Sequence, residues 1–229
     1  YSFNGWSGDG VSDPNAPFTT VDMYQARTVT AHFVQRSDEK SILIISSSPL
    51  KGGTTLGSGE YTTGVTISIS ANPSTGYSFG GWLGEGVSDP NASSTTVDMS
   101  GDRNLTASFS LNSYDLSILA GTGGSVTGSG SFSYGTDAVI SASPSNGFFF
   151  AGWYGAGISN PNASSTTVDM SEDRNLSASF SLNSYDLSVL AGTGGSVTGS
   201  GTFTHGSSPT ISANPSTGYS FGGWLGEGV

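Results

Sequence analysis

Apolar and polar residues alternate with a period of two through most of the chain, the pattern of half-buried β-strands. Leu176, Ala178 and Phe180, for example, alternate with Asn and Ser. A second alternating run stops at Pro144, which has no N–H to donate to a strand ladder. No ten-residue stretch spaces its apolar positions as a helix does. The pattern therefore predicts an all-β fold made of six or seven short strands per structural unit.

The same stretch of sequence recurs along the chain, which indicates a tandem array. Residues 76–99 occur four times, whole or in part, and their tryptophans are Trp6, Trp82, Trp153 and Trp224, at spacings of 76, 71 and 71 residues. A fixed period of this length is typical of repeat architectures in which one small module is copied. We therefore expect modules of about 71 residues in tandem.

The phase of the repeat sets the expected boundaries. The five extra residues of the first spacing fall in the densest cluster of charges, so this segment is predicted to be an irregular joint. The absence of a Gly/Ser or Pro linker elsewhere predicts stiff joints and a rod-like array. The predicted order is the C-terminal half of a repeat (1–35), the joint (36–42), two full repeats (43–112 and 113–183), and the N-terminal half of a repeat (184–229).

The two partial repeats are complementary in phase. Residues 1–35 lack the strands that residues 184–229 supply, and only Tyr1–Val11 and Tyr219–Val229 overlap. An open half-module exposes strand edges, which folded proteins avoid. We therefore expect either a native chain that continues in both directions or neighbouring chains that complete each other by strand donation. The overlap makes donation partly redundant and favours the first.

Composition and charge exclude several function classes. The formal net charge is −11 and only 10% of residues are charged, so the chain has no basic footprint for nucleic acid or anionic lipid. No apolar run is long enough to insert into a membrane. With no cysteine, the chain has no disulfide framework and no thiolate metal site. The two histidines, His32 and His205, occupy unrelated phases of the repeat.

Three motifs together resemble the divergent branch of the bacterial internalin B-repeat family: Gly76-Tyr-Ser-Phe-Gly-Gly-Trp82, Thr95-Thr-Val-Asp-Met99, and Asp102-Arg-Asn-Leu-Thr-Ala-Ser-Phe109. The resemblance implies a small β-grasp-like module of long secreted or surface-anchored proteins, often adhesins, without catalytic residues. It implies an extracellular, cell-surface structural or adhesion array that acts as a stalk, shaft or fibre. The expected partners are neighbouring repeats or chains, and a polysaccharide or host surface is a further candidate.

The repeated aromatic residues carry two open interpretations, as core anchors or as glycan contacts. If Gly80 and Gly81 form a bulge, the following tryptophan turns into the core; without a bulge it faces solvent or the next module. Core anchoring is the favoured interpretation for a small domain. The alternative function is a carbohydrate-binding module. The residues concerned are Trp6, Trp82, Trp153, Trp224, Tyr77 and Tyr219.

The turn after Trp6 carries Asp9 and Asp13, and the turn after Trp82 carries Glu85 and Asp89, so Ca²⁺ binding is an alternative to a plain turn. Glu85 and Asp89 become Ala156 and Asn160 in the next copy, which removes both carboxylates. Asx-Pro-Asn is also an ordinary turn sequence. We therefore expect turns rather than a metal site, and no cofactor.

Catalysis is not expected in this segment. Asp98 with Asp102, and Asp169 with Asp173 in the next copy, suggest an acid/base pair. The arginine beside each pair, Arg103 or Arg174, more simply predicts an exposed ion pair. No nucleophile, base and orienting residue recur together. The remaining alternative is an accessory region of a secreted hydrolase whose catalytic domain lies elsewhere.

Overall fold

The computed structural model describes residues 1–34 and 39–226, which divide into two compact units, Tyr1–Leu111 and Asn112–Val229. Within the described residues the regular structure is β-strand, apart from one three-residue 3₁₀ helix at Leu50–Gly52. The prediction of an all-β fold is confirmed. Unit 1 holds an N-terminal half-module (1–34) and module 1 (40–111), and unit 2 holds module 2 (113–182) and a C-terminal half-module (184–226).

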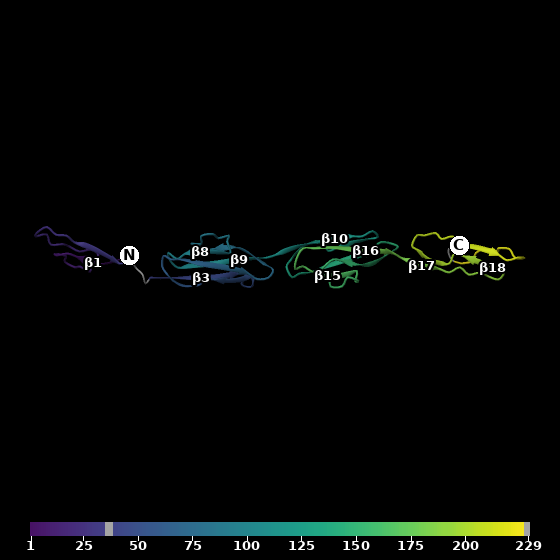
Figure 1. Cartoon of the computed structure of the whole chain (residues 1–229), viewed down its shortest axis with the longest axis horizontal. Helices are drawn as coiled ribbons and strands as arrows, with labels where there is room; N and C mark the ends of the chain where they lie inside the picture. Colours follow the sequence, from purple (N-terminus) through teal and green to yellow (C-terminus); the bar gives the residue numbers. More distant parts are fainter. Residues whose placement is uncertain (35–38, 227–229) are drawn as a thin grey trace. The chain divides into compact units, whose positions relative to one another are not determined.

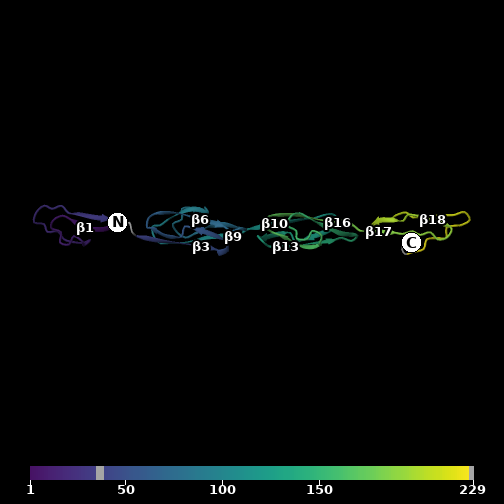
Figure 2. The same cartoon turned by 60° about the horizontal axis from the view of Figure 1, so that its bottom comes forward.

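Module 2 consists of two sheets. The four-stranded sheet has the order β12-β10-β16-β14 and the three-stranded sheet the order β11-β13-β15. β10 and β16 run parallel, and the other neighbours are antiparallel. Figures 1 and 2 show β10 and β16 on one side of the module and β15 and β13 on the other. The strands are β10 (Ser113–Ala120), β11 (Gly124–Thr127), β12 (Gly130–Ser133), β13 (Asp137–Pro144), β14 (Phe148–Tyr154), β15 (Ser165–Asp169) and β16 (Arg174–Leu182).

Module 1 repeats this topology, with sheet orders β5-β3-β9-β7 and β4-β6-β8 and a parallel β3/β9 pair. Its strands are β3 (Lys40–Ser48), β4 (Gly53–Leu56), β5 (Gly59–Thr62), β6 (Thr66–Pro73), β7 (Tyr77–Leu83), β8 (Ser94–Asp98) and β9 (Arg103–Leu111). Of the predicted irregular joint 36–42, residues 36–38 lie outside the described residues. Lys40 and Ile42 belong to β3, where they pair with Thr62 and Glu60.

The core of each complete module lies between its two sheets. Along β9 the inward residues Leu105, Ala107 and Phe109 are buried, whereas the residues between them are more exposed. Val97 on β8 and Met99, the residue that follows β8, belong to the same buried cluster and are completely buried. Full burial of side chains of this size contributes roughly 1.5–3 kcal/mol each. The period-two alternation of the sequence therefore corresponds to a two-sheet core.

The half-modules keep only the strands whose partners lie within the same half. In the N-terminal half-module β1 (Ser2–Ser7) pairs with β2 (Thr30–Val34). In the C-terminal half-module β17 pairs with β19, and β18 pairs with β20. The bounds of these strands are β17 (Ser184–Leu187), β18 (Gly195–Thr198), β19 (Gly201–Thr204) and β20 (Ser212–Pro215).

Two segments of the C-terminal half-module correspond to strand residues of module 2 but do not form strands themselves. Residues 188–191 correspond to the part of β10 that pairs with β16, and residues 208–211 to the part of β13 that pairs with β15. Neither segment forms a strand. Their partner strands belong to the other half of a module, so the backbone has no neighbouring strand to bond.

Candidate functional site

The repeated tryptophan lies just after a β-bulge. On β7, Phe79 pairs with Phe109, but Gly81 pairs with Ser108, so one extra residue lies between them. This shift turns Phe79 and Trp82 toward the same side of the sheet. Trp82 is 4% exposed and its counterpart Trp153 is 3% exposed. The bulge on which the sequence interpretation depended is therefore present, and both tryptophans lie in the cores.

Each buried indole also holds the turn that follows it. The Nε1–H of Trp82 donates to the carbonyl oxygen of Ala92 at 2.9 Å, and its backbone N–H donates to the carbonyl oxygen of Pro90 at 2.7 Å. Trp153 makes the same two bonds in module 2, to Ala163 and Pro161, at 2.9 and 2.8 Å. The indole thus satisfies its only donor while fixing the turn to the sheet.

A ring cluster surrounds the indole. In module 2 the ring centroid of Phe150 lies 5.4 Å from that of Trp153, in a tilted pair, and 6.0 Å from that of Phe180, in a T-shaped pair. The same three rings meet in module 1 at 5.5 and 6.0 Å. These are the geometries that aromatic pairs prefer. An indole packed in this way presents no free face on which a sugar ring can stack.

The other predicted aromatic residues lie nearer the surface. Tyr77 is half-buried at the start of β7. In the half-modules Trp6 and Trp224 are half-exposed, and Tyr219 is 58% exposed. The complete modules therefore bury their tryptophans, and the half-modules leave theirs partly accessible.

The acidic turn is built by side-chain oxygens rather than by charge. In module 1 a carboxylate oxygen of Asp89 accepts the backbone N–H of Asn91 at 2.9 Å. In module 2 the amide oxygen of Asn160 accepts the N–H of Asn162 at 3.1 Å. The neutral side chain thus performs the same Asx-turn role. Among the described residues no group of three or more His, Cys, Asp and Glu could hold a metal ion.

The arginine beside the acidic pair is more deeply placed than the sequence indicated. We expected an exposed ion pair, but the side chain of Arg174 is 9% exposed. Its Nε–H donates to the backbone carbonyl of Asp169 at 3.1 Å, and its guanidinium also contacts the carboxylates of Asp169 and Glu172. The close packing has a local cause, because the guanidinium lies over Gly157, where a Cβ would come within 2.8 Å of it.

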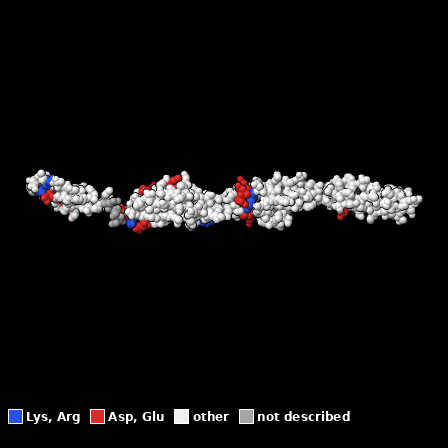
Figure 3. All heavy atoms as spheres, in the orientation of Figure 1, with Lys and Arg blue, Asp and Glu red and all other residues white. Residues whose placement is uncertain are grey.

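The outer surface carries few charges. Figure 3 shows the acidic and basic side chains in a few small clusters, with most of the visible surface uncharged. The outward residues of module 2 include Leu119 and Tyr154, which are 72% and 62% exposed. Over the described part of the chain, no helix is long and apolar enough to cross a membrane.

Comparison with known protein families shows that one family model matches the chain along most of its length. The model of the divergent InlB B-repeat domain matches four consecutive segments: 1–37, 44–113, 114–184 and 185–229. The chain therefore belongs to the divergent InlB B-repeat family, as its motifs suggested. This is a repeat domain of surface proteins and is not a known enzyme family. Searches of curated proteins and of solved structures found no match.

Proposed function

We propose that this chain is part of the stalk of an extracellular bacterial surface protein, a mechanical spacer made of repeated β modules. Family membership supports a repeat array of surface proteins. A spacer also requires that consecutive modules be coupled stiffly, because a flexible linker lets the distance between its ends fluctuate. The observation that carries the proposal is the joint inside unit 2.

The joint consists of a single residue that is bonded on both sides. β16 ends at Leu182 and β17 begins at Ser184, so only Asn183 lies between them. Its N–H donates to the carbonyl oxygen of Gly147 in module 2, at 2.8 Å. Its own carbonyl oxygen accepts the backbone N–H of His205 in the following half-module, also at 2.8 Å. The backbone of the linker is thus held by both neighbours.

Side chains close the same joint. The imidazole of His205 lies directly over Gly147, where an added Cβ would come within 2.0 Å of the ring. The ring of Tyr185 packs beside the imidazole, with centroids 6.2 Å apart. Gly147 has a φ of +82°, which a residue with a Cβ rarely adopts. A glycine here permits both the turn and the close approach of the neighbouring ring.

The stiffness of this joint can be measured by the distance between two spin labels. The chain has no cysteine, so Ser143→Cys on β13 and Ser212→Cys on β20 create two unique labelling sites, both exposed. We expect pulsed electron resonance to give one narrow distance distribution. The matched control carries a four-residue Gly-Ser insertion after Asn183, which should broaden it.

A broad distribution in the parent chain, as wide as that of the insertion variant, would refute the stalk proposal. Gly147→Ala offers an intermediate test, because its Cβ collides with the imidazole of His205. This substitution should broaden or shift the distribution without unfolding module 2, and circular dichroism of the same sample checks the fold.

A further inference from the structure

The outer face of the four-stranded sheet in module 2 carries an open groove of about 600 Å³ across β10, β16 and β14. Its walls are Leu119 on β10 and Tyr154 on β14, which are 72% and 62% exposed. Both residues pair with Ser177 on the middle strand, so a small side chain lies between two large ones. Neighbouring strands are about 4.8 Å apart, which places the Cα atoms of the walls roughly 10 Å apart.

The floor of the groove offers free hydrogen-bonding groups. It is formed by Asn175 and Ser177, and within the described residues neither side chain has a hydrogen-bond partner. The floor of module 1 is different, because Thr106, the counterpart of Ser177, shares a hydrogen bond of 3.0 Å with the hydroxyl of Ser46. Only the floor in module 2 therefore has both an amide and a hydroxyl available to a ligand.

The charges around the groove disfavour an anionic ligand. Among the described residues, none that lines the groove is charged. Asp115 and Asp173 lie two residues before Ser117 and Asn175 on the sequence, at one end of the groove. A carboxylate oxygen of Asp173 accepts the backbone N–H of Asp115 at 2.8 Å. These carboxylates and the formal net charge of −11 repel an acidic ligand.

The combination of an exposed ring with free polar groups favours a hydrated ligand over a protein surface. A dry interface with a second copy of the chain would leave the amide of Asn175 and the hydroxyl of Ser177 buried without partners, which is costly. A ligand rich in hydroxyl groups pairs with both. Binding sites for small ligands commonly join apolar walls to a few polar groups that fix the orientation.

We propose that this groove binds a neutral, β-linked glucan, with one sugar ring held between Leu119 and Tyr154. All ring substituents of a β-linked glucose unit are equatorial, so both faces of its ring present C–H bonds. These bonds carry a partial positive charge, and the face of the tyrosine ring is negative. Asn175 and Ser177 hydrogen-bond the sugar hydroxyls. Glycan contact thus falls to the residue after Trp153, whose own indole is buried.

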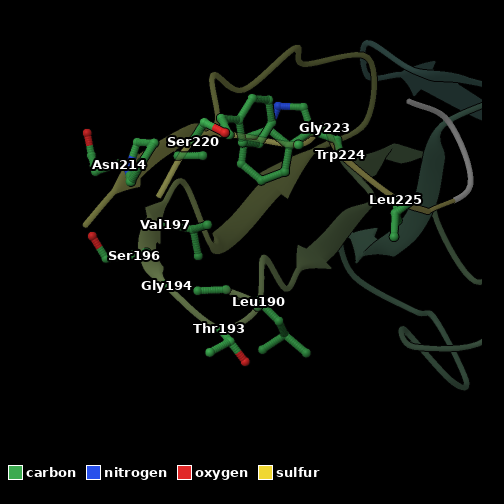
Figure 4. Close-up of a pocket in the computed structure, with 17 residues that line it drawn as sticks. Leu190, Thr193, Gly194, Ser196, Val197, Asn214, Ser220, Gly223, Trp224 and Leu225 are labelled. Carbon is green, nitrogen blue, oxygen red and sulfur yellow. The ribbon is translucent and has the colours of Figure 1, made fainter. Parts of the chain in front are cut away.

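The tyrosine wall belongs to module 2 alone. The counterparts of Tyr154 in the other copies are Ser7, Leu83 and Leu225. Figure 4 shows Leu225 in the C-terminal half-module, together with Leu190, the counterpart of Leu119. In module 1 the wall opposite Leu83 is the short side chain of Ser46. We therefore expect one glycan site in this chain.

The test is a titration of the full ¹⁵N-labelled chain with cellopentaose, followed by nuclear magnetic resonance. The backbone amide signals of the groove should shift and saturate, and these belong to residues 117–119, 154–155 and 175–177. The signals of their counterparts in module 1 should stay in place. The matched probe is cellopentaose oxidised to carboxylates at C6, which keeps the linkage but adds negative charge, and it should leave the groove signals unchanged.

The chain itself supplies the matched substitution. Tyr154→Leu gives module 2 the residue that module 1 carries at this place, so the fold should be kept, and cellopentaose binding should weaken at least ~10-fold. The control Leu83→Ala changes an equally exposed wall position in module 1 and should leave the titration unchanged.

A second variant rebuilds the groove where it is absent. Ser46→Leu, Leu83→Tyr and Thr106→Ser together give module 1 the walls and the floor hydroxyl of module 2. The number of cellopentaose molecules bound per chain should rise from one to two, and the new shifts should appear in module 1. A gain of this kind cannot result from misfolding of module 2.

Three results would overturn the proposal. One is the absence of groove shifts with cellopentaose at tens of millimolar. Another is an equal affinity of the parent chain and the Tyr154→Leu variant. The third is a set of groove shifts that appear without sugar as the protein concentration rises and that cellopentaose does not change, because the face would then bind a second copy of the chain.

Discussion

Truncation of Trp153 to alanine should nearly unfold module 2. The side chain is 3% exposed, packs against Phe150, and donates its only N–H to Ala163. Replacing a buried tryptophan with alanine costs about 3–5 kcal/mol, and the unpaired carbonyl adds about 1 kcal/mol. A module of this size is expected to be stable by roughly 4–10 kcal/mol. The substitution therefore removes a large part of the stability of module 2.

The assay should separate the modules, because only one of them is altered. Hydrogen exchange at increasing urea, measured peptide by peptide, gives the free energy of unfolding of module 2, with module 1 of the same molecule as an internal reference. Trp153→Phe keeps a ring but has no N–H, so its loss should be smaller, about 1–2 kcal/mol.

The matched control is the adjacent residue on the same strand. Tyr154 follows Trp153 on β14 but points outward and is 62% exposed, so Tyr154→Ala should change stability by less than about 0.5 kcal/mol. The reasoning fails if Trp153→Ala and Tyr154→Ala have the same urea midpoint, since the indole would then contribute nothing to the core.

Two further predictions concern a glycine and an arginine. Gly84→Ala should destabilise module 1 by more than 2 kcal/mol, because Gly84 has a φ of +124° and its Cβ would lie 2.6 Å from a methyl carbon of Leu105. Gly101→Ala, where nothing lies within 4 Å, should be nearly neutral in the same urea titration. Arg174→Lys should lower the free energy of unfolding of module 2 by about 1–2 kcal/mol in the urea titration. An ammonium group cannot reproduce the planar guanidinium that binds both the carbonyl and the carboxylate of Asp169. A loss no larger than that of the exposed control Tyr154→Ala would contradict this prediction.

The sequence specified the local structure of the modules well. Alternation along 174–180 predicts a strand with Leu176 and Phe180 inward, and β16 places them so. Pro144 is the last residue of β13, where the run was expected to stop. Both results follow from side chains and backbone groups of adjacent residues, which a single sequence displays.

Features that depend on distant partners were not predictable. The parallel pairing of β10 with β16 joins residues almost 60 positions apart, such as Leu116 and Arg174. The sequence left open whether the side chain of Trp82 faces the core or the solvent, because the presence of a one-residue bulge decides which face of the sheet it occupies. The burial of Arg174 was also missed, since it arises from its position over Gly157. The only sign of this burial in the sequence was the small residue Gly157, which leaves room for the guanidinium of Arg174.

The tryptophan of each complete module binds the following turn through backbone carbonyl oxygens of the turn, which bears on how freely the sequence of the turn can be changed. Pro90 and Ala92 contribute only their carbonyl oxygens to the bonds with Trp82, so the side chains of these two residues are not needed for those bonds. Glu85, whose side chain is 94% exposed, is already alanine in the next copy. The turn is therefore a suitable graft position for a short peptide epitope, and an array displays one copy per module. Multivalent display of this kind raises avidity without any new contact.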